Sequence, residues 1–181
     1  MPPDDILDSP ADNPRNTAMA PGGKSAARAA GMTMKEFDEL VGEAFQEIPE
    51  KFRAKVQNVA LLVEEEPSEE LRKSEKLHPN ETLLGLYHGV PATERGDAYG
   101  VGMTLPDTIT VFKKPILDAA AAEVSATFDW GPPTEKMKKR IRDIVRDTIW
   151  HEIAHYFGMD EYEVDAREAE GTNQFQGGAA T

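Results

Sequence analysis

A long amphipathic stretch near the carboxyl end of the sequence constrains the fold more than any other feature. Thr134 is a residue type that commonly caps a helix, and Gly158 stands where a helix end is expected. Between them an apolar residue recurs at every fourth position, at Ile141, Val145, Ile149, Ile153 and Phe157. This spacing is typical of one buried helix face. The pattern predicts a long helix and makes it the strongest single element in the chain.

The same stretch carries the sequence His-Glu-Ile-Ala-His at positions 151–155. Residues four apart on a helix lie roughly 40° from each other and one turn apart, so His151 and His155 can direct their imidazoles at one ion. Glu152 lies roughly 60° round the helix from His155, close enough to reach a water molecule beside that ion. The H-E-x-x-H spacing therefore predicts a zinc site with Glu152 as its catalytic residue.

The chemistry needs all three side chains. Neutral imidazoles bind Zn²⁺ without cancelling its charge, which lowers the pKa of a bound water towards about 7. A carboxylate at Glu152 can take the proton from that water and later deliver it to a leaving amine. Mn²⁺ or Co²⁺ can fill the same set of ligands, so the motif alone leaves the identity of the ion open.

A catalytic zinc needs a third protein ligand, and several acidic residues follow the motif. Glu161 completes the pattern H-E-x-x-H-x-x-G-x-x-E and is the first candidate; Asp160 is the second. Both can instead be solvated acids at the start of a following helix. In that case the candidates come from further along, at Glu163, Asp165 and Glu168. Tyr156 and Tyr162 lie close to the motif, and we interpret Tyr156 as a packing residue.

Further patterns predict the elements around the long helix. Thr33 and Glu36 fit a capping box, followed by apolar residues at helical spacing as far as Phe45, and Pro49 ends this helix or starts a short second one. Strands are predicted at 56–63, 83–87 and 107–112, the last ended by Lys-Lys-Pro. Short helices are predicted at 67–73, 116–124 and 161–170, and residues 91–105 form a glycine-rich loop.

The two ends of the chain differ in composition from its middle. Residues 1–31 and 171–181 are rich in Pro, Gly, Ala and polar residues and lack an apolar period, so we expect disordered tails around one domain at 32–170. The segment Ala18–Ser25 matches a relaxed phosphate-binding loop, but no strand precedes it, so we set a nucleotide site aside.

Charge and composition exclude several classes of protein. The formal net charge of −13 disfavours binding to nucleic acid or to an anionic membrane surface, because both need clustered Lys and Arg. The absence of cysteine excludes disulfides, thiolate ligands and thiol nucleophiles. No secretory leader and no apolar run of membrane-spanning length are recognised, which favours a cytoplasmic protein.

Several stretches together resemble the small bacterial zincin-like metallopeptidases. They are FDELVGEAFQEIPEKF, NVALLVEEEP, LLGLYHGVPATERG, LPDTITVFKKPIL and HEIAHYFGMDE, in this order between Met34 and Asp165. The resemblance implies a compact α+β domain in which a short mixed sheet packs against the active-site helix. It also implies that an edge strand beside the cleft, most readily Thr108–Phe112, pairs with an extended substrate. The family motif usually ends in Asp or a similar small polar residue, where this chain has Glu161, and no S-x-M-x-Y turn follows.

The sequence therefore predicts a zinc-dependent peptidase that acts on a peptide or protein substrate. His151, His155 and Glu161 are the expected metal ligands, and Glu152 is the expected general base and acid. The alternative is a zinc-stabilised binding or adaptor protein with little turnover, in which the metal serves folding. An open fourth position on the ion would favour the enzyme, whereas four protein ligands would favour the adaptor.

Overall fold

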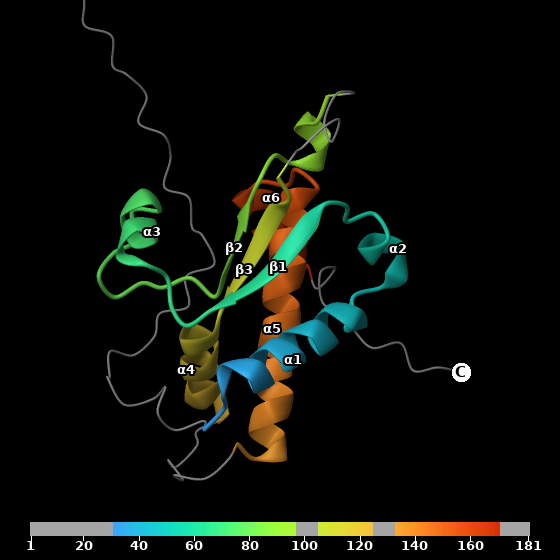
Figure 1. Ribbon diagram of the computed structural model, residues 1–181. Helices are drawn as coiled ribbons and strands as arrows, with labels where there is room; N and C mark the ends of the chain where they lie inside the picture. Colours follow the sequence, from blue (N-terminus) through green and yellow to red (C-terminus); the bar gives the residue numbers. More distant parts are fainter. Residues whose placement is uncertain (1–30, 97–104, 125–132, 171–181) are drawn as a thin grey trace, which may run out of the picture.

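The computed structural model describes residues 31–96, 105–124 and 133–170 (Figure 1). The elements are α1 (Met34–Glu47), α2 (Glu50–Arg53), β1 (Val59–Glu64), α3 (Glu69–Ser74), β2 (Gly85–His88), the 3₁₀ turn η1 (Ala92–Glu94), β3 (Asp107–Phe112), α4 (Lys113–Val124), α5 (Glu135–Tyr156) and α6 (Glu161–Ala169). The predicted tails lie, apart from Gly31, outside the described residues, as does the segment Ala18–Ser25.

The three strands form one mixed sheet in the order β1-β3-β2. β1 pairs with β3 in parallel, and β2 pairs with β3 antiparallel. The prediction that Thr108–Phe112 is an edge strand is therefore wrong, because β3 lies in the middle of the sheet. Most of β3 is buried, with Val111 and Phe112 fully inaccessible, as expected for a strand that has neighbours on both sides. The edge strand beside α5 is β2.

Helix α5 lies against β2 and β3 and also contacts α1 and α4 (Figure 1). The apolar face that the sequence predicts is the one that is buried: Ile141, Val145, Ile149 and Ile153 are all inaccessible to solvent. The core that they join contains residues from α1, β3 and α4, including Phe37, Val41, Ile109, Val111, Ile116 and Ala120, and Tyr87 of β2 packs against it. Burial of this face fixes the rotation of α5, and with it the direction in which His151 and Glu152 point.

The ends of the helices follow the local sequence closely. The Thr33 side chain accepts a hydrogen bond from the backbone of Glu36, whose carboxylate returns to the backbone of Thr33, so the predicted capping box is present. Helix α4 begins at Lys113, three residues before the predicted start at 116, and follows β3 directly. Pro115 is compatible with this early start because a proline in the first turn of a helix removes no intrahelical hydrogen bond.

The other predicted elements are present with shifted ends. The strands predicted at 56–63 and 83–87 occupy 59–64 and 85–88, and the helices predicted at 67–73 and 161–170 occupy 69–74 and 161–169. The predicted loop at 91–105 contains the η1 turn, and part of this loop lies outside the described residues. The observed architecture is the α+β class with a short mixed sheet, as predicted.

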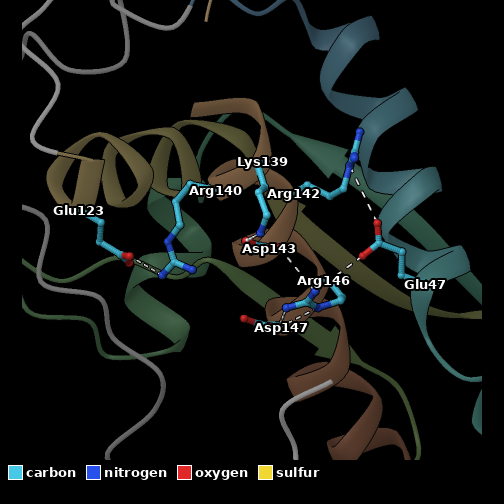
Figure 2. Close-up of polar contacts among 8 residues, drawn as sticks. All are labelled: Glu47, Glu123, Lys139, Arg140, Arg142, Asp143, Arg146 and Asp147. Atoms are coloured by element: carbon cyan, nitrogen blue, oxygen red, sulfur yellow. Dashed lines mark hydrogen bonds and ion pairs between the residues drawn. The ribbon is translucent and has the colours of Figure 1, made fainter. Parts of the chain in front are cut away.

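Ion pairs join the part of α5 that precedes the histidines to its neighbouring helices (Figure 2). Arg146 pairs with Glu47 of α1 at 3.7 Å and with Asp147 on its own helix at 2.9 Å. Arg140 pairs with Glu123 at the end of α4. These contacts hold the part of α5 that precedes the histidines, so they orient the helix without entering the candidate site.

Candidate functional site

The two histidines of the motif converge in the last two turns of α5. Nε2 of His151 and Nε2 of His155 lie 3.1 Å apart, with the rings at a steep mutual angle of 72°. His151 is buried, whereas His155 is partly accessible. The four-residue spacing therefore brings one nitrogen from each ring to the same point, as the sequence predicts.

A tight turn after α5 brings an acidic side chain to this point. Gly158 has φ of +86°, its N–H donates to the carbonyl of His155, and Met159 N–H donates to the carbonyl of Ala154. These two bonds form a Schellman motif, in which glycine adopts the left-handed conformation at low cost. Helix α6 then begins at Glu161, whose carboxylate oxygens lie 3.5 Å from Nε2 of His151 and 3.3 Å from Nε2 of His155.

The spacing of these three side chains fits a tetrahedral ion. Two ligand atoms that are each about 2.0–2.1 Å from a tetrahedral zinc lie about 3.4 Å apart. The two Nε2 atoms lie 3.1 Å apart, one oxygen of Glu161 lies 3.3 Å from His155 and its other oxygen 3.5 Å from His151. With one ligand atom taken from each side chain, the three atoms all lie within 4.8 Å of one another. Two imidazoles and one carboxylate are also a ligand set that zinc uses in catalytic sites.

The alternative ligands from the sequence have other positions. Asp160 caps α6, accepting from Glu163 N–H at 2.8 Å, while Glu163 accepts from Asp160 N–H at 3.1 Å. Glu168 contacts Nδ1 of His151, the ring nitrogen that faces away from Glu161. Among the described residues, the converging His-His-Glu group consists of His151, His155 and Glu161. Asp160, Glu163, Asp165 and Glu168 are not part of it.

The Nδ1 atoms of His151 and His155, which point away from Glu161, each lie near a hydrogen-bond acceptor. Nδ1 of His151 lies 3.1 Å from a carboxylate oxygen of Glu168, and Nδ1 of His155 lies 2.9 Å from the carbonyl of Met159. In the neutral imidazoles, a proton on each Nδ1 would leave the lone pair of each Nε2 facing the converging group. Such outer contacts orient metal-binding histidines and raise the basicity of the ligating nitrogen.

Burial and mutual contact govern the protonation of this cluster. Burial opposes a charge on His151, but hydrogen bonds with Glu161 and Glu168 outweigh it and raise the pKa of His151 to about 10. Burial also opposes a charge on Glu161, and hydrogen bonds with both histidines overcome it, lowering the pKa of Glu161 to about 2. Glu161 therefore remains an anionic oxygen donor near neutral pH.

Glu152 lies beside the converging group and is held by the sheet. It is 7% exposed, and its Oε2 accepts a hydrogen bond from the backbone N–H of Tyr87 at 2.7 Å. Burial raises the pKa of Glu152, partly opposed by the nearby histidines and by this hydrogen bond. Close approach of β2 to α5 depends on Gly85, where a Cβ atom would lie 2.6 Å from Cγ2 of Thr148 and 3.2 Å from Oε1 of Glu152.

A cavity of about 190 Å³ opens onto these side chains. Its walls are formed by β2 and the residues before it, by Glu75, by α5 and by the start of α6: Glu75, Leu83, Leu84, Gly85, Leu86, Tyr87, His151, Glu152, His155 and Glu161. The edge strand and the candidate metal group thus border the same space.

Tyr156 and Tyr162 do not line this cavity. Tyr156 is buried, and its hydroxyl donates to the carbonyl of Lys55 and accepts from Gln57 N–H, so its packing interpretation agrees with the structure. Tyr162 is 80% exposed.

Sequence reasoning missed a polar cluster on the face of the sheet that packs against α5. The Tyr87 hydroxyl donates to Oδ2 of Asp107 at 2.7 Å, and Asp107 forms an ion pair with Arg95. Burial and the contact with Asp107 raise the pKa of Tyr87, so its phenol stays protonated and remains a donor. One signal for this cluster was present, since Asp107 shares a strand face with Ile109 and Val111 and therefore had to be buried with a partner.

Comparison with known protein families matches residues 56–171 to the family described as zincin-like metallopeptidase. The matched range contains all three strands, α5 and the whole converging group. No curated protein matches the chain. No helix among residues 31–96, 105–124 and 133–170 is long and apolar enough to cross a membrane.

Proposed function

Because the chain belongs to the zincin-like metallopeptidase family, we propose that it is a zinc-dependent peptidase with its active centre at the carboxyl end of α5. His151, His155 and Glu161 hold the ion, and Glu152 acts as general base and then as general acid. The observation that carries this proposal is the convergence of two imidazole nitrogens and one carboxylate at separations of 3.1, 3.3 and 3.5 Å.

Zinc bound to these residues would supply Lewis-acid chemistry, polarising a carbonyl group and acidifying a water molecule. The chain supplies the proton transfers. Oε2 of Glu152 is engaged by Tyr87 N–H, which leaves Oε1 to accept a proton from water and return it to the leaving amine. Burial raises the pKa of Glu152, which brings its basicity closer to that needed for proton transfer near neutral pH.

The surroundings of the site support a peptide or protein substrate. Leu83, Leu84 and Leu86 form an apolar wall of the cavity. Its volume of about 190 Å³ is large enough for one amino-acid side chain. Strand β2 borders this cavity and lies at the edge of the three-stranded sheet, so an extended peptide can approach it in strand conformation.

The number of converging side chains favours the enzyme over the zinc-stabilised adaptor. Among the described residues, the group has three members, whereas structural zinc sites usually have four protein ligands. Glu152 is also buried beside the group without belonging to it, a position that suits proton transfer better than metal binding.

Metal analysis and a catalytic variant test the proposal together. Purified wild type, reconstituted with Zn²⁺ and separately with Mn²⁺ or Co²⁺, should bind about one ion per chain, and His151→Ala should lose it. His88→Ala is the matched control, since His88 is exposed on the edge strand and should retain the metal.

Glu152→Gln should retain zinc and fold but lose hydrolysis of a quenched fluorescent peptide library, by roughly 10²–10⁴-fold. Undiminished hydrolysis in Glu152→Gln would refute the assigned base. Stoichiometric zinc without hydrolysis of any library member by the wild type would favour the adaptor instead.

A further inference from the structure

The hydrogen bond that orients Glu152 comes from a short strand at the edge of the sheet. β2 has four residues and pairs with β3, and Tyr87 lies opposite Ile109 in this pairing. The N–H of Tyr87 is directed to Oε2 of Glu152 at 2.7 Å. Short edge strands are readily displaced, so the position of this donor depends on whatever else fixes Tyr87.

The side chain of Tyr87 supplies that second attachment. Its hydroxyl donates to Oδ2 of Asp107 at 2.7 Å, and Asp107 is 5% exposed at the start of the central strand β3. Asp107 also forms an ion pair with Arg95. The carboxylate of Asp107 is therefore fixed by two donors, and a buried carboxylate bonded in this way resists displacement.

The contacts continue from Arg95 back to the helix that carries Glu152. Arg95 donates to the Tyr156 hydroxyl at 3.3 Å, and its guanidinium lies 4.6 Å from the centre of the Tyr156 ring. Tyr156 lies four residues after Glu152 on α5, one turn further along the same side. The chain of contacts therefore starts and ends on α5 and passes through Tyr87 and Asp107 on the sheet.

The backbone packs tightly against Asp107 in this chain of contacts. A Cβ atom at Gly89 would lie 2.2 Å from Cγ of Asp107, so a side chain there would displace the carboxylate or the strand. The backbone after β2 thus passes directly over Asp107, which keeps Tyr87 and its acceptor in register.

We propose that Tyr87 and Asp107 are positioning residues that hold the Tyr87 N–H against Glu152 and thereby aim the Glu152 carboxylate into the cavity. The proposal rests on the proposed peptidase function for its kinetic consequence, although the positioning itself can be measured without turnover. Neither side chain belongs to the converging His-His-Glu group, so their effect passes through Glu152.

The kinetic test uses conservative variants of the zinc-loaded full chain. Tyr87→Phe removes the phenolic donor and keeps the ring and the backbone N–H, and it should lower kcat by about tenfold with KM and zinc content unchanged. Asp107→Asn retains an acceptor for Tyr87 and should keep more activity than Asp107→Ala. Tyr162→Phe removes an exposed hydroxyl and is the matched control, expected to behave as wild type. Equal kcat in Tyr87→Phe and wild type would overturn the proposal.

The second readout is hydrogen exchange of the amide at position 87, followed by NMR in zinc-loaded protein. Exchange should accelerate about tenfold in Tyr87→Phe and in Asp107→Ala, less in Asp107→Asn, and should stay unchanged in Tyr162→Phe. Glu152→Ala should accelerate the same amide, which identifies its acceptor. If Asp107→Ala does not fold, Tyr87→Phe and Asp107→Asn decide the outcome. Unchanged exchange in both would refute the positioning role, whereas a wild type that cleaves no peptide would refute only the peptidase function.

Discussion

A carboxylate oxygen of Glu168 lies 3.1 Å from Nδ1 of His151, while Nε2 of the same ring faces Glu161 at 3.5 Å. Two acids from α6 thus contact opposite nitrogens of one imidazole, one in the converging group and one behind it. With the proton of the neutral ring on Nδ1, the Glu168 carboxylate accepts a hydrogen bond from it, and the Nε2 lone pair then points to the position where an ion would bind.

Removing the Glu168 carboxylate should weaken metal binding without abolishing it. Glu168→Ala leaves the converging group intact but removes the acceptor that orients His151, so the affinity for zinc should fall about 10–100-fold. Competition with a chelator of known affinity measures the change. Glu170→Ala is the control, since Glu170 is exposed at the end of the same helix. Equal affinities in the two variants would remove Glu168 from the site.

The identity of the third ligand can be tested with two neighbouring acids. Glu161→Ala should lose stoichiometric zinc, because the remaining two imidazoles leave the ion with too few protein ligands. Asp160→Asn should keep both zinc and helix α6, since Asn caps a helix about as well as Asp. Elemental analysis measures the zinc content of both variants. Zinc lost in Asp160→Asn and retained in Glu161→Ala would make Asp160 the ligand.

The turn at Gly158 should tolerate no side chain. Gly158→Ala places a Cβ atom 2.1 Å from Oγ1 of Thr93 and forces alanine into a left-handed conformation that costs roughly 1–2 kcal/mol. Urea unfolding should therefore show a loss of at least about this size. The double variant Thr93→Ala, Gly158→Ala relieves the collision but not the backbone strain, so it should recover part of the loss. A fully stable Gly158→Ala would contradict the assigned turn.

The contact between β2 and α5 makes a similar prediction at Gly85. Gly85→Ala directs a methyl group to 2.6 Å from Cγ2 of Thr148, so β2 must move away from the helix, and the free energy of unfolding should fall by about 1–3 kcal/mol. Thr148→Ser removes the Cγ2 methyl group, and combined with Gly85→Ala it should recover part of the lost stability, because the close contact with Glu152 remains. Chemical denaturation of the single and double variants measures this recovery, and its absence would show that the collision lies elsewhere.

The ion pairs on the part of α5 that precedes the histidines should differ in their contributions to stability. The Arg146 side chain is 18% exposed and pairs with Glu47, Asp143 and Asp147, so Arg146→Ala should lower the free energy of unfolding by about 1 kcal/mol. The Lys139 side chain is 76% exposed, and Lys139→Ala should change stability by less than about 0.5 kcal/mol. Thermal unfolding at low and high salt measures the stability lost in each variant. The zinc content should stay unchanged in both Arg146→Ala and Lys139→Ala.

The sequence predicted helix α5 and its motif well because both depend on local geometry. The period of apolar residues from Ile141 to Ile153 and the spacing of His151 and His155 follow from the helical repeat alone. The capping box at Thr33 is equally local and is present. Strand ends were less accurate, because pairing with a neighbour rather than local composition decides where a strand stops.

What the sequence by itself determined was therefore the helix, the two imidazoles and the acid between them. Only the tertiary structure decided which carboxylate meets the imidazoles, because the turn at Gly158 and the packing of α6 place Glu161 in front of His151 and Glu168 behind it. It also decided that β2 is the edge strand beside the site, and that Glu152 is held by Tyr87, 65 residues earlier in the chain. A contact across that separation depends on how the whole sheet packs against α5, which no local pattern in the sequence encodes.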